Sequence, residues 1–580
     1  MPLLAIVLGS AAILLVAYFS YGGVLAGLFQ LSPTAKTPAY ELQDDLDFQP
    51  LPPRSLLPQH FSAIAAAGPI VGPILAGLTF GWVPALIWIL AGSILIGGVH
   101  DMAALVASVR HKAKSIAEVV REQMSPVSYF LFLTFIWIAL VYIIVAFADV
   151  TASSFVGAAK EENGNVAGAA IAGSSLLYLI LPIGMGLAIR YLKVPAGIAT
   201  LIALPLVVGA VLVGKYVPID LQGWLHLDSE GTARKYWAAI LLVYCLAAGV
   251  APVWLLLQPR GELGGYFLYA ALGIGALGLM LGGGNVQYPA FRGFEIAAEG
   301  KPTVALFPML FITIACGACS GFHSLIASGT TAKQLRKETD AKVVGYGTML
   351  LEAMVAVVSL CCVMMFLPGS TELKGTPNQV YAQGLGRFAQ TLGIPKEAAI
   401  SFALLAFTTF VYDTLDVCTR LGRFIIEELT GLHNWVGKLI GTGLTAGVPL
   451  FFLLRHPSSA PPLFQTFWNL FGASNQLLAA LTLLGVTVWL WNTKRATWVW
   501  FVVGLPTVFM YAMSTWALAN MTVPKLLSEK RPSFLADPVP YVGLVLLALA
   551  AAMLLEALRV IFVQNAGPPM GPKAVMKPAA

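Results

Sequence analysis

The chain has 580 residues, of which 58% are hydrophobic and 11% are charged, and its mean hydropathy is +0.81. Soluble domains carry roughly 25% charged residues, so this composition indicates an integral membrane protein with many spans and leaves no room for a soluble catalytic domain. The net charge of +6 comes from lysines and arginines between the apolar segments, where it reports membrane topology rather than binding to nucleic acid.

Apolar segments long enough to cross a membrane, which takes about 20 residues, recur along the chain, and we expect about fifteen of them. Residues 1–30 form an uncharged span that we interpret as an extra N-terminal transmembrane helix and not as a cleaved signal. A polar loop at 31–56 follows. The further expected spans are 57–80, 83–109, 127–157, 170–189, 194–214, 236–258, 263–283, 302–328, 343–366, 398–420, 436–454, 464–491, 496–519 and 539–563, before a tail at 564–580.

The span at 57–80 contains the run QHFSAIAAAGPIVGP, with Gly68, Pro69, Gly72 and Pro73 close together. Proline lacks an N–H and clashes with the preceding turn, so this pattern predicts a break in the helix. In a bilayer such a break is tolerated where it is buried in protein or lines a polar cavity, and transporters use it to bind a substrate and its coupling ion. A proline-kinked packing helix is the alternative interpretation.

A second broken span is predicted at 302–328, where Gly317 and Gly321 interrupt an apolar segment. One span later, a shift of 251 positions aligns Asp101 with Glu352, each at the start of an alanine-rich half-helix. An odd number of spans separates the two copies, as an inverted-topology repeat requires. We therefore expect a first repeat at 57–214, two intervening spans in 215–300, a second repeat at 301–491 and two peripheral spans in 492–563.

Basic residues set the expected orientation. The segments 110–126 and 329–342 each contain four lysines or arginines and are predicted to be cytoplasmic. With alternating spans, the loop at 31–56 is also cytoplasmic, and the N-terminus lies outside.

Ionisable groups inside spans are costly and indicate functional sites. Glu352 lies about nine residues into its span, roughly 14 Å at 1.5 Å per residue and near the middle of a 30 Å core. A carboxylate there suits a group that gains and loses a proton during transport; a static hydrogen-bond partner is the alternative. Asp413 and Asp416 share a helix face, and a local ion pair between Asp416 and Arg420 competes with a coupling role for Asp416.

Other polar groups in the spans have two interpretations each. Thr408 and Thr409 lie near mid-membrane, where their hydroxyls could ligate a cation or bond back onto their own helix. Asp101, with His100 before it, lies near the cytoplasmic end, where a proton relay competes with snorkelling or loop anchoring. His323 is a candidate for proton transfer or a hydrogen-bonded core histidine.

Two amides and two cysteines in the spans are expected to be structural. Asn475 and Gln476 favour hydrogen bonding between helices over contact with a ligand. The spacing of Cys316 and Cys319 is one that metal or redox sites use, but no second pair supports it. We therefore expect packing cysteines, no metal and no cofactor.

Two sets of candidate residues follow. The candidate substrate-binding residues are His60, Ser62, Gly68, Pro69, Gly72, Ser320, His323 and Ser324. The candidate residues for ion or proton coupling are Glu352, Asp416, Asp413, Thr408, Thr409 and Asp101. The sequence contains no H-E-x-x-H or G-x-S-x-G motif, which argues against an intramembrane enzyme, and no repeated pore-lining rings that would indicate a channel.

Six stretches, in one order between about residues 55 and 485, resemble the carbon starvation protein A family: QHFSAIAAAGPIVGPILAG, APVWLLLQPR, FPMLFITIACGACSGFHSLIASGTT, VVGYGTMLLEAMVA, LDVCTRLGRFIIEEL and LFGASNQLLAAL. The resemblance implies a bacterial inner-membrane uptake system for peptides or, in close relatives, pyruvate, driven by protons. It also implies the fold of the amino acid, polyamine and organocation superfamily, a pair of five-helix inverted repeats with broken first helices. The Pro252-containing span is a rival for the start of the second repeat.

Two departures from the family pattern bear on selectivity. The usual paired histidines appear here as Gln59-His60, and the usual Asp-Thr-Gly-Thr-Arg run has Val417 and Cys418 after Asp416. If the replaced residues take part in coupling, this protein selects another substrate or ion.

The sequence therefore predicts an all-α, multi-pass secondary transporter of the bacterial inner membrane. Its expected partners are the lipid bilayer, a proton or a sodium ion, and a small substrate such as a short peptide, an amino acid or a 2-oxo acid. A channel is the less favoured alternative.

Overall fold

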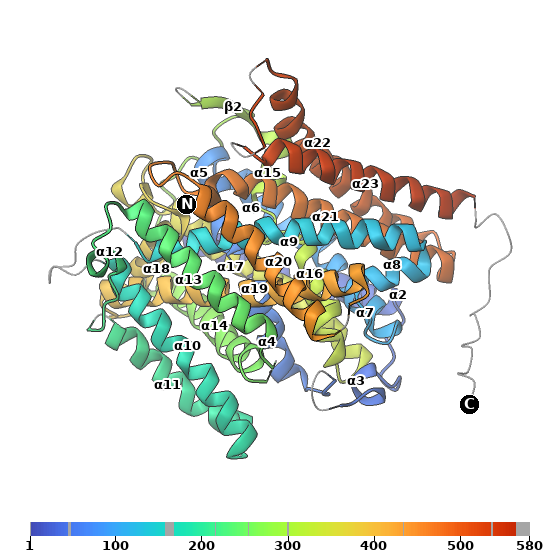
Figure 1. Ribbon diagram of the computed structural model, residues 1–580, viewed down its shortest axis with the longest axis horizontal. Coiled ribbons are helices and arrows are strands. Elements are labelled where there is room, and N and C mark those ends of the chain that lie inside the picture. The colour runs from blue at the N-terminus through green and yellow to red at the C-terminus, as the bar shows by residue number, and fades with distance from the viewer. Residues whose placement is uncertain are drawn as a thin grey trace.

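The computed structural model describes residues 2–44, 48–65, 67–156, 167–214, 216–252, 254–282, 284–298, 301–432, 434–529, 531–534 and 537–563. Within these residues, 13 helices are long and apolar enough to cross a membrane, and one further pair is bent at a short break. The predicted all-α membrane fold is thereby confirmed (Figure 1). The only departure among these residues is an antiparallel hairpin of β1 (Glu295–Ala298) and β2 (Lys301–Ala305).

The helices run as follows. The first half of the chain contains α1 (Leu3–Phe19), α2 (Tyr21–Leu28), α3 (Pro38–Glu41), α4 (Pro53–Ile64), α5 (Gly68–Phe80), α6 (Trp82–Gly92), α7 (Gly98–Arg110), α8 (Ile116–Gln123), α9 (Pro126–Ser154), α10 (Ala167–Tyr191), α11 (Ala196–Gly214), α12 (Leu221–Trp224), α13 (Glu230–Val250) and α14 (Leu257–Gly282). The second half contains α15 (Leu306–Thr313), α16 (Gly321–Gly329), α17 (Thr348–Met364), α18 (Pro377–Gln390), α19 (Lys396–Thr430), α20 (Trp435–Arg455), α21 (Leu463–Lys494), α22 (Leu505–Leu527) and α23 (Val539–Phe562).

Both predicted helix breaks are present. The first separates α4 from α5, which are bent by 47° to each other, and it falls just before the Gly-Pro pairs rather than among them. Pro69 sits in the first turn of α5, where a missing N–H costs no helical hydrogen bond. The second break is longer, because residues 314–320 between α15 and α16 are not helical.

Two π-helical turns interrupt the spans that follow the two breaks. One covers Ser93–Gly97 and leads into α7, and the other covers Lys342–Gly347 and leads into α17. Asp101 and Glu352 lie within five residues of the ends of these turns. Turns of this kind occur often at functional sites, and here they precede the two carboxylates that the sequence aligned.

The region around Pro252 differs from the prediction. The helix α13 ends at Val250 and α14 begins at Leu257, so Pro252 lies in a connection between two helices and not within a span. As a result Arg260, which the expected spans 236–258 and 263–283 leave in the loop between them, enters the bundle in the first turn of α14 and is fully buried.

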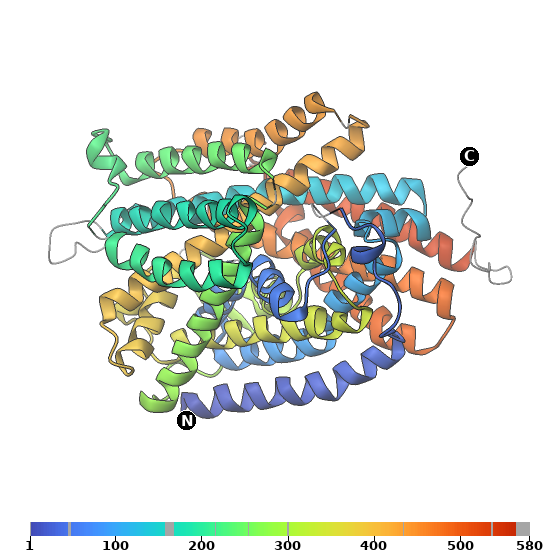
Figure 2. The same cartoon turned by 90° about the horizontal axis from the view of Figure 1, so that it is seen from below.

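The segments predicted to be cytoplasmic gather at one end of the bundle. Arg110 Nε lies 2.7 Å from Glu338 Oε1, and the backbone N–H of Ser32 donates to the same carboxylate at 2.8 Å. Residues from 31–56, 110–126 and 329–342 therefore share one side, near α3 and α8 in Figure 1. The N-terminal helix α1 runs along the outer edge of the bundle (Figure 2).

Candidate functional site

The non-helical residues 314–320 form the centre of the candidate site, and α21 satisfies their backbone. Asn475 accepts from the Phe322 N–H at 2.9 Å and donates to Ser320 Oγ at 2.9 Å. Gln476 donates to the Cys319 carbonyl at 3.1 Å. The expectation that these two amides bond between helices is confirmed, and their partners are the polar groups of a broken helix that lipid could not satisfy.

Glycines bring the two breaks into direct contact. A Cβ atom on Gly68 would lie 2.3 Å from the Cys316 side chain, and one on Gly72 would lie 2.6 Å from the Thr313 carbonyl oxygen. Pro69 between them is buried in α5. These three candidate substrate residues thus pack the first broken helix against the second, which explains why small residues occur there. A bulky residue at Gly68 would overlap the Cys316 side chain and disrupt this packing.

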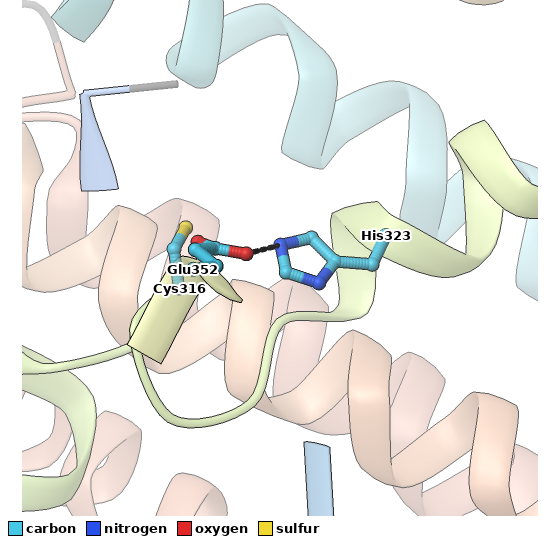
Figure 3. Close-up of side chains that lie close together, drawn as sticks. All are labelled: Cys316, His323 and Glu352. Atoms are coloured by element: carbon cyan, nitrogen blue, oxygen red, sulfur yellow. Dashed lines mark ion pairs between the residues drawn. The ribbon is translucent and has the colours of Figure 1, made fainter. Parts of the chain in front are cut away.

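His323, in the first turn of α16, lies between two carboxylates from other helices. Its Nδ1 is 2.8 Å from Asp101 Oδ2, and its Nε2 is 3.2 Å from Glu352 Oε2. His100 Nδ1 contacts the second Asp101 oxygen at 2.8 Å. All four side chains are fully buried, and Figure 3 shows the His323 ring pointing at the Glu352 carboxylate.

This arrangement excludes one of the interpretations that the sequence left open. Asp101 does not snorkel to the surface, because it is fully buried and bonded to two histidines. His323 is hydrogen-bonded through Nδ1 only; among the described residues, its Nε2 and both Glu352 oxygens have no hydrogen-bond partner of suitable geometry. A buried imidazole with one free nitrogen beside a carboxylate can take up or release a proton.

Arg260 organises a second buried cluster. Its Nε donates to Asp413 Oδ1 at 2.5 Å, and its terminal nitrogen contacts Asp416. Tyr244 donates to Asp416 at 2.9 Å, and Ser62 donates to the other Asp413 oxygen at 2.6 Å. Two carboxylates thus face one guanidinium, and the three groups together carry one negative charge when ionised.

The partner predicted for Asp416 was Arg420, but the structure pairs it with Arg260, which is 156 positions away in the sequence. The Arg420 guanidinium instead donates to the Ala251 carbonyl at 2.6 Å. Sequence reasoning missed Arg260 because it lies at the edge of an apolar segment. The available signal was the pair of carboxylates on one face of α19, since two buried acids need a cation.

Of the remaining candidates, Thr408 and Ser324 take structural partners, whereas Thr409 does not. Thr408 donates to the Leu405 carbonyl at 2.9 Å and lies 3.1 Å from Ser175 Oγ, so it bonds back onto its own helix. Thr409 is buried, and its hydroxyl has no partner among the described residues. Ser324 donates to the Gly321 carbonyl at 2.7 Å.

A small cavity of about 50 Å³ lies next to the second cluster, and this volume corresponds to roughly four water molecules. His60 lines it and contacts Thr331 Oγ1 through Nδ1 at 2.9 Å. Gln59 and Val417, two of the three residues that depart from the family pattern, also line it. The full lining is Leu56, Gln59, His60, Ala63, Leu257, Gln258, Gly261, Ile326, Thr330, Thr331, Gln334, Asp413 and Val417.

Two broken helices that meet inside an apolar bundle, next to buried ionisable groups, are typical of secondary transporters. The chain belongs to the carbon starvation protein CstA family, whose family model matches residues 3–372 and 369–517.

Relatives within this family are transporters and not enzymes. The chain is 29% identical to a peptide transporter CstA of Campylobacter jejuni, over 93% of this chain and 82% of the relative. It is 30% identical to the pyruvate/proton symporter BtsT of Escherichia coli, over 88% of this chain and 81% of the symporter. A peptide transporter CstA of Escherichia coli is also 30% identical, over 87% of this chain and 79% of that protein.

Among solved structures, a manganese transporter from Eremococcus coleocola is similar at a TM-score of 0.44 and 14% identity, over 90% of this chain and 99% of the other.

Proposed function

We propose that the protein is a secondary active transporter that imports a small nutrient across the bacterial inner membrane together with protons. The observation that carries the proposal is the position of His323, in the first turn after the second break, between Asp101 and Glu352. Coupling requires a group that changes protonation next to the substrate pathway, and broken helices are where carriers build that pathway. The relatives named as peptide transporters and as a pyruvate/proton symporter fit this class.

Glu352 is assigned the coupling proton because of its partners. Asp413 and Asp416 both face Arg260, which holds their charge in place. Asp101 is held by two histidines. Glu352 has one imidazole nitrogen 3.2 Å away and no hydrogen-bond partner among the described residues. It is therefore the carboxylate whose protonation disrupts the fewest hydrogen bonds and ion pairs.

The cavity beside His60 supports a proposal for the substrate pathway. Its lining contains amides, hydroxyls, His60 and Asp413, and neither lysine nor arginine is among the described residues there. An excess of negative charge favours a substrate with an ammonium group, such as an amino acid or a short peptide, over pyruvate or another 2-oxo acid. The cavity is too small for any of these in this conformation, so binding requires α4, α14, α16 and α19 to move apart.

Uptake into proteoliposomes tests the proposal. Labelled amino acids, short peptides and pyruvate would each be supplied under an inward proton gradient, and separately under an inward sodium gradient. We expect saturable accumulation of an amine-bearing substrate that collapses when a protonophore removes the proton gradient. Accumulation that follows only the sodium gradient would favour sodium coupling, and flux that does not saturate would indicate a channel.

A further inference from the structure

Cys316 joins the His323 and Glu352 side chains in a three-ligand cluster at the second break (Figure 3). One sulfur, one nitrogen and one carboxylate oxygen lie within 4.8 Å of one another, and all three side chains are buried. We propose that this cluster is a binding site for one borderline divalent cation, with Zn²⁺ the natural fit. The sequence led us to expect no metal here, because nothing in it brings His323 and Glu352 next to Cys316.

The spacing of the ligands suits a tetrahedral ion. Ligands at about 2.0–2.1 Å from zinc lie about 3.3 Å apart along a tetrahedral edge, and His323 Nε2 and Glu352 Oε2 are 3.2 Å apart. The sulfur lies within 4.8 Å of the ligand atoms of both residues, and a shift of Cys316 would bring it to the zinc–sulfur distance of about 2.3 Å. Cys316 can make this movement because it lies on the non-helical backbone of residues 314–320 and not inside a helix.

The surroundings of His323 match those of a metal ligand. Metal-bound histidines usually give their second ring nitrogen to a carboxylate, which fixes the ring and its tautomer. Asp101 occupies that place at 2.8 Å from Nδ1 and is itself held by His100. Nε2 is left pointing toward Glu352 and Cys316, and neither Nε2 nor the Glu352 oxygens have a hydrogen-bond partner among the described residues.

The donor set selects the class of ion. Mg²⁺ and Ca²⁺ prefer oxygen ligands only, whereas thiolate and imidazole favour zinc and its neighbours in the first transition series. Three protein ligands leave a fourth position open, which is the pattern of a site that exchanges a ligand rather than of a closed structural site. On binding, the Cys316 thiol gives up its proton to solvent and the sulfur binds as the thiolate.

Co²⁺ titration of the purified full-length protein in detergent is the test, because a thiolate–cobalt charge-transfer band reports sulfur ligation directly. We expect one Co²⁺ per chain with this band, displaced by Zn²⁺. Cys316→Ser should remove the band, and the matched variant Cys319→Ser, three residues away on the same segment, should keep it. Asp101→Asn should keep the band and weaken Co²⁺ binding by at least about tenfold, as loss of an outer carboxylate does.

Several outcomes would overturn the site. They are the absence of the band in the unmodified protein, its persistence in Cys316→Ser, or its loss in Cys319→Ser when that variant elutes as a folded monodisperse species. None of these readouts depends on transport, so they are independent of the proposed function. One consequence does rest on that function: bound Zn²⁺ would occupy His323 and Glu352 and block proton-driven uptake. Metal binding without inhibition of uptake would count against the coupling role and not against the metal site.

Discussion

Replacing Arg260 with methionine tests whether one guanidinium holds the second cluster together. Arg260 is fully buried and contacts both Asp413 and Asp416. Methionine fills a similar volume but leaves two carboxylates buried without a cation. Removing one partner of a buried ion pair costs about 3–5 kcal/mol, so we expect Arg260→Met to lower the free energy of unfolding by at least about 3 kcal/mol.

The assay is reversible unfolding in mixed detergent micelles, followed by circular dichroism. The exposed Arg559, which lies 3.5 Å from Glu556, is the matched control, and its change to methionine should alter stability by less than about 0.5 kcal/mol. Adding Asp413→Asn and Asp416→Asn to Arg260→Met removes both stranded charges and should restore most of the loss, because replacing a whole buried ionic group is often nearly neutral. A loss below about 1 kcal/mol for Arg260→Met, or a triple variant no more stable than the single one, would refute the reasoning.

Three further predictions concern topology, packing and selectivity. Cysteines at the exposed positions Lys112 and Lys374 should differ in labelling by an impermeant thiol reagent added outside, with reaction at Lys374 only; labelling at Lys112 would reverse the orientation. Gly97→Ala places a Cβ 2.3 Å from the Ala318 carbonyl oxygen and should cost about 1–3 kcal/mol of stability, whereas Gly443→Ala meets no atom within 4 Å and should be neutral or slightly stabilising; equal effects would contradict the close packing at the second break. The double change Gln59→His and Val417→Thr, which restores the family pattern in the cavity, should shift the order of substrate preference in competition uptake, and an unchanged order would remove the cavity from the substrate pathway.

Local sequence chemistry was sufficient to predict the two breaks. Glycine and proline act on the backbone within a few residues, so the existence of both interruptions could be predicted from the chain alone, although the first falls just before Gly68 and not among the Gly-Pro pairs. Basic residues likewise grouped the segments around Arg110 and Glu338 at one end of the bundle, because positive charge outside spans is a local signal.

The ionic partners could not be predicted, because they depend on how distant helices pack. His323 meets Asp101 across 222 positions, and Arg260 meets Asp413 across 153. An assignment based on hydropathy puts a lone arginine into a loop when it lies next to an apolar segment. Only the packing of α14 against α19 shows that Arg260 is inside, and the same is true of Cys316 beside Glu352.

Asp101 and Glu352, which the sequence aligned by a shift of 251 positions, also share two features of the structure. Both carboxylates follow a π-helical turn within five residues, and both face His323. A repeat with opposite orientation would place such a pair on either side of a shared group. The two-fold relation of the halves remains our prediction.

The central claim is that Glu352 carries the coupling proton, and the most direct measurement compares exchange with accumulation in proteoliposomes containing Glu352→Gln. Glutamine mimics the protonated carboxyl group, so the variant should exchange labelled for unlabelled substrate at a rate near that of the unmodified protein but should not accumulate substrate under an inward proton gradient. Asp416→Asn, in which Arg260 keeps Asp413 as a partner, should still accumulate it. Full gradient-driven accumulation by Glu352→Gln, with its loss in Asp416→Asn, would contradict the assignment and move the coupling role to the Arg260 cluster.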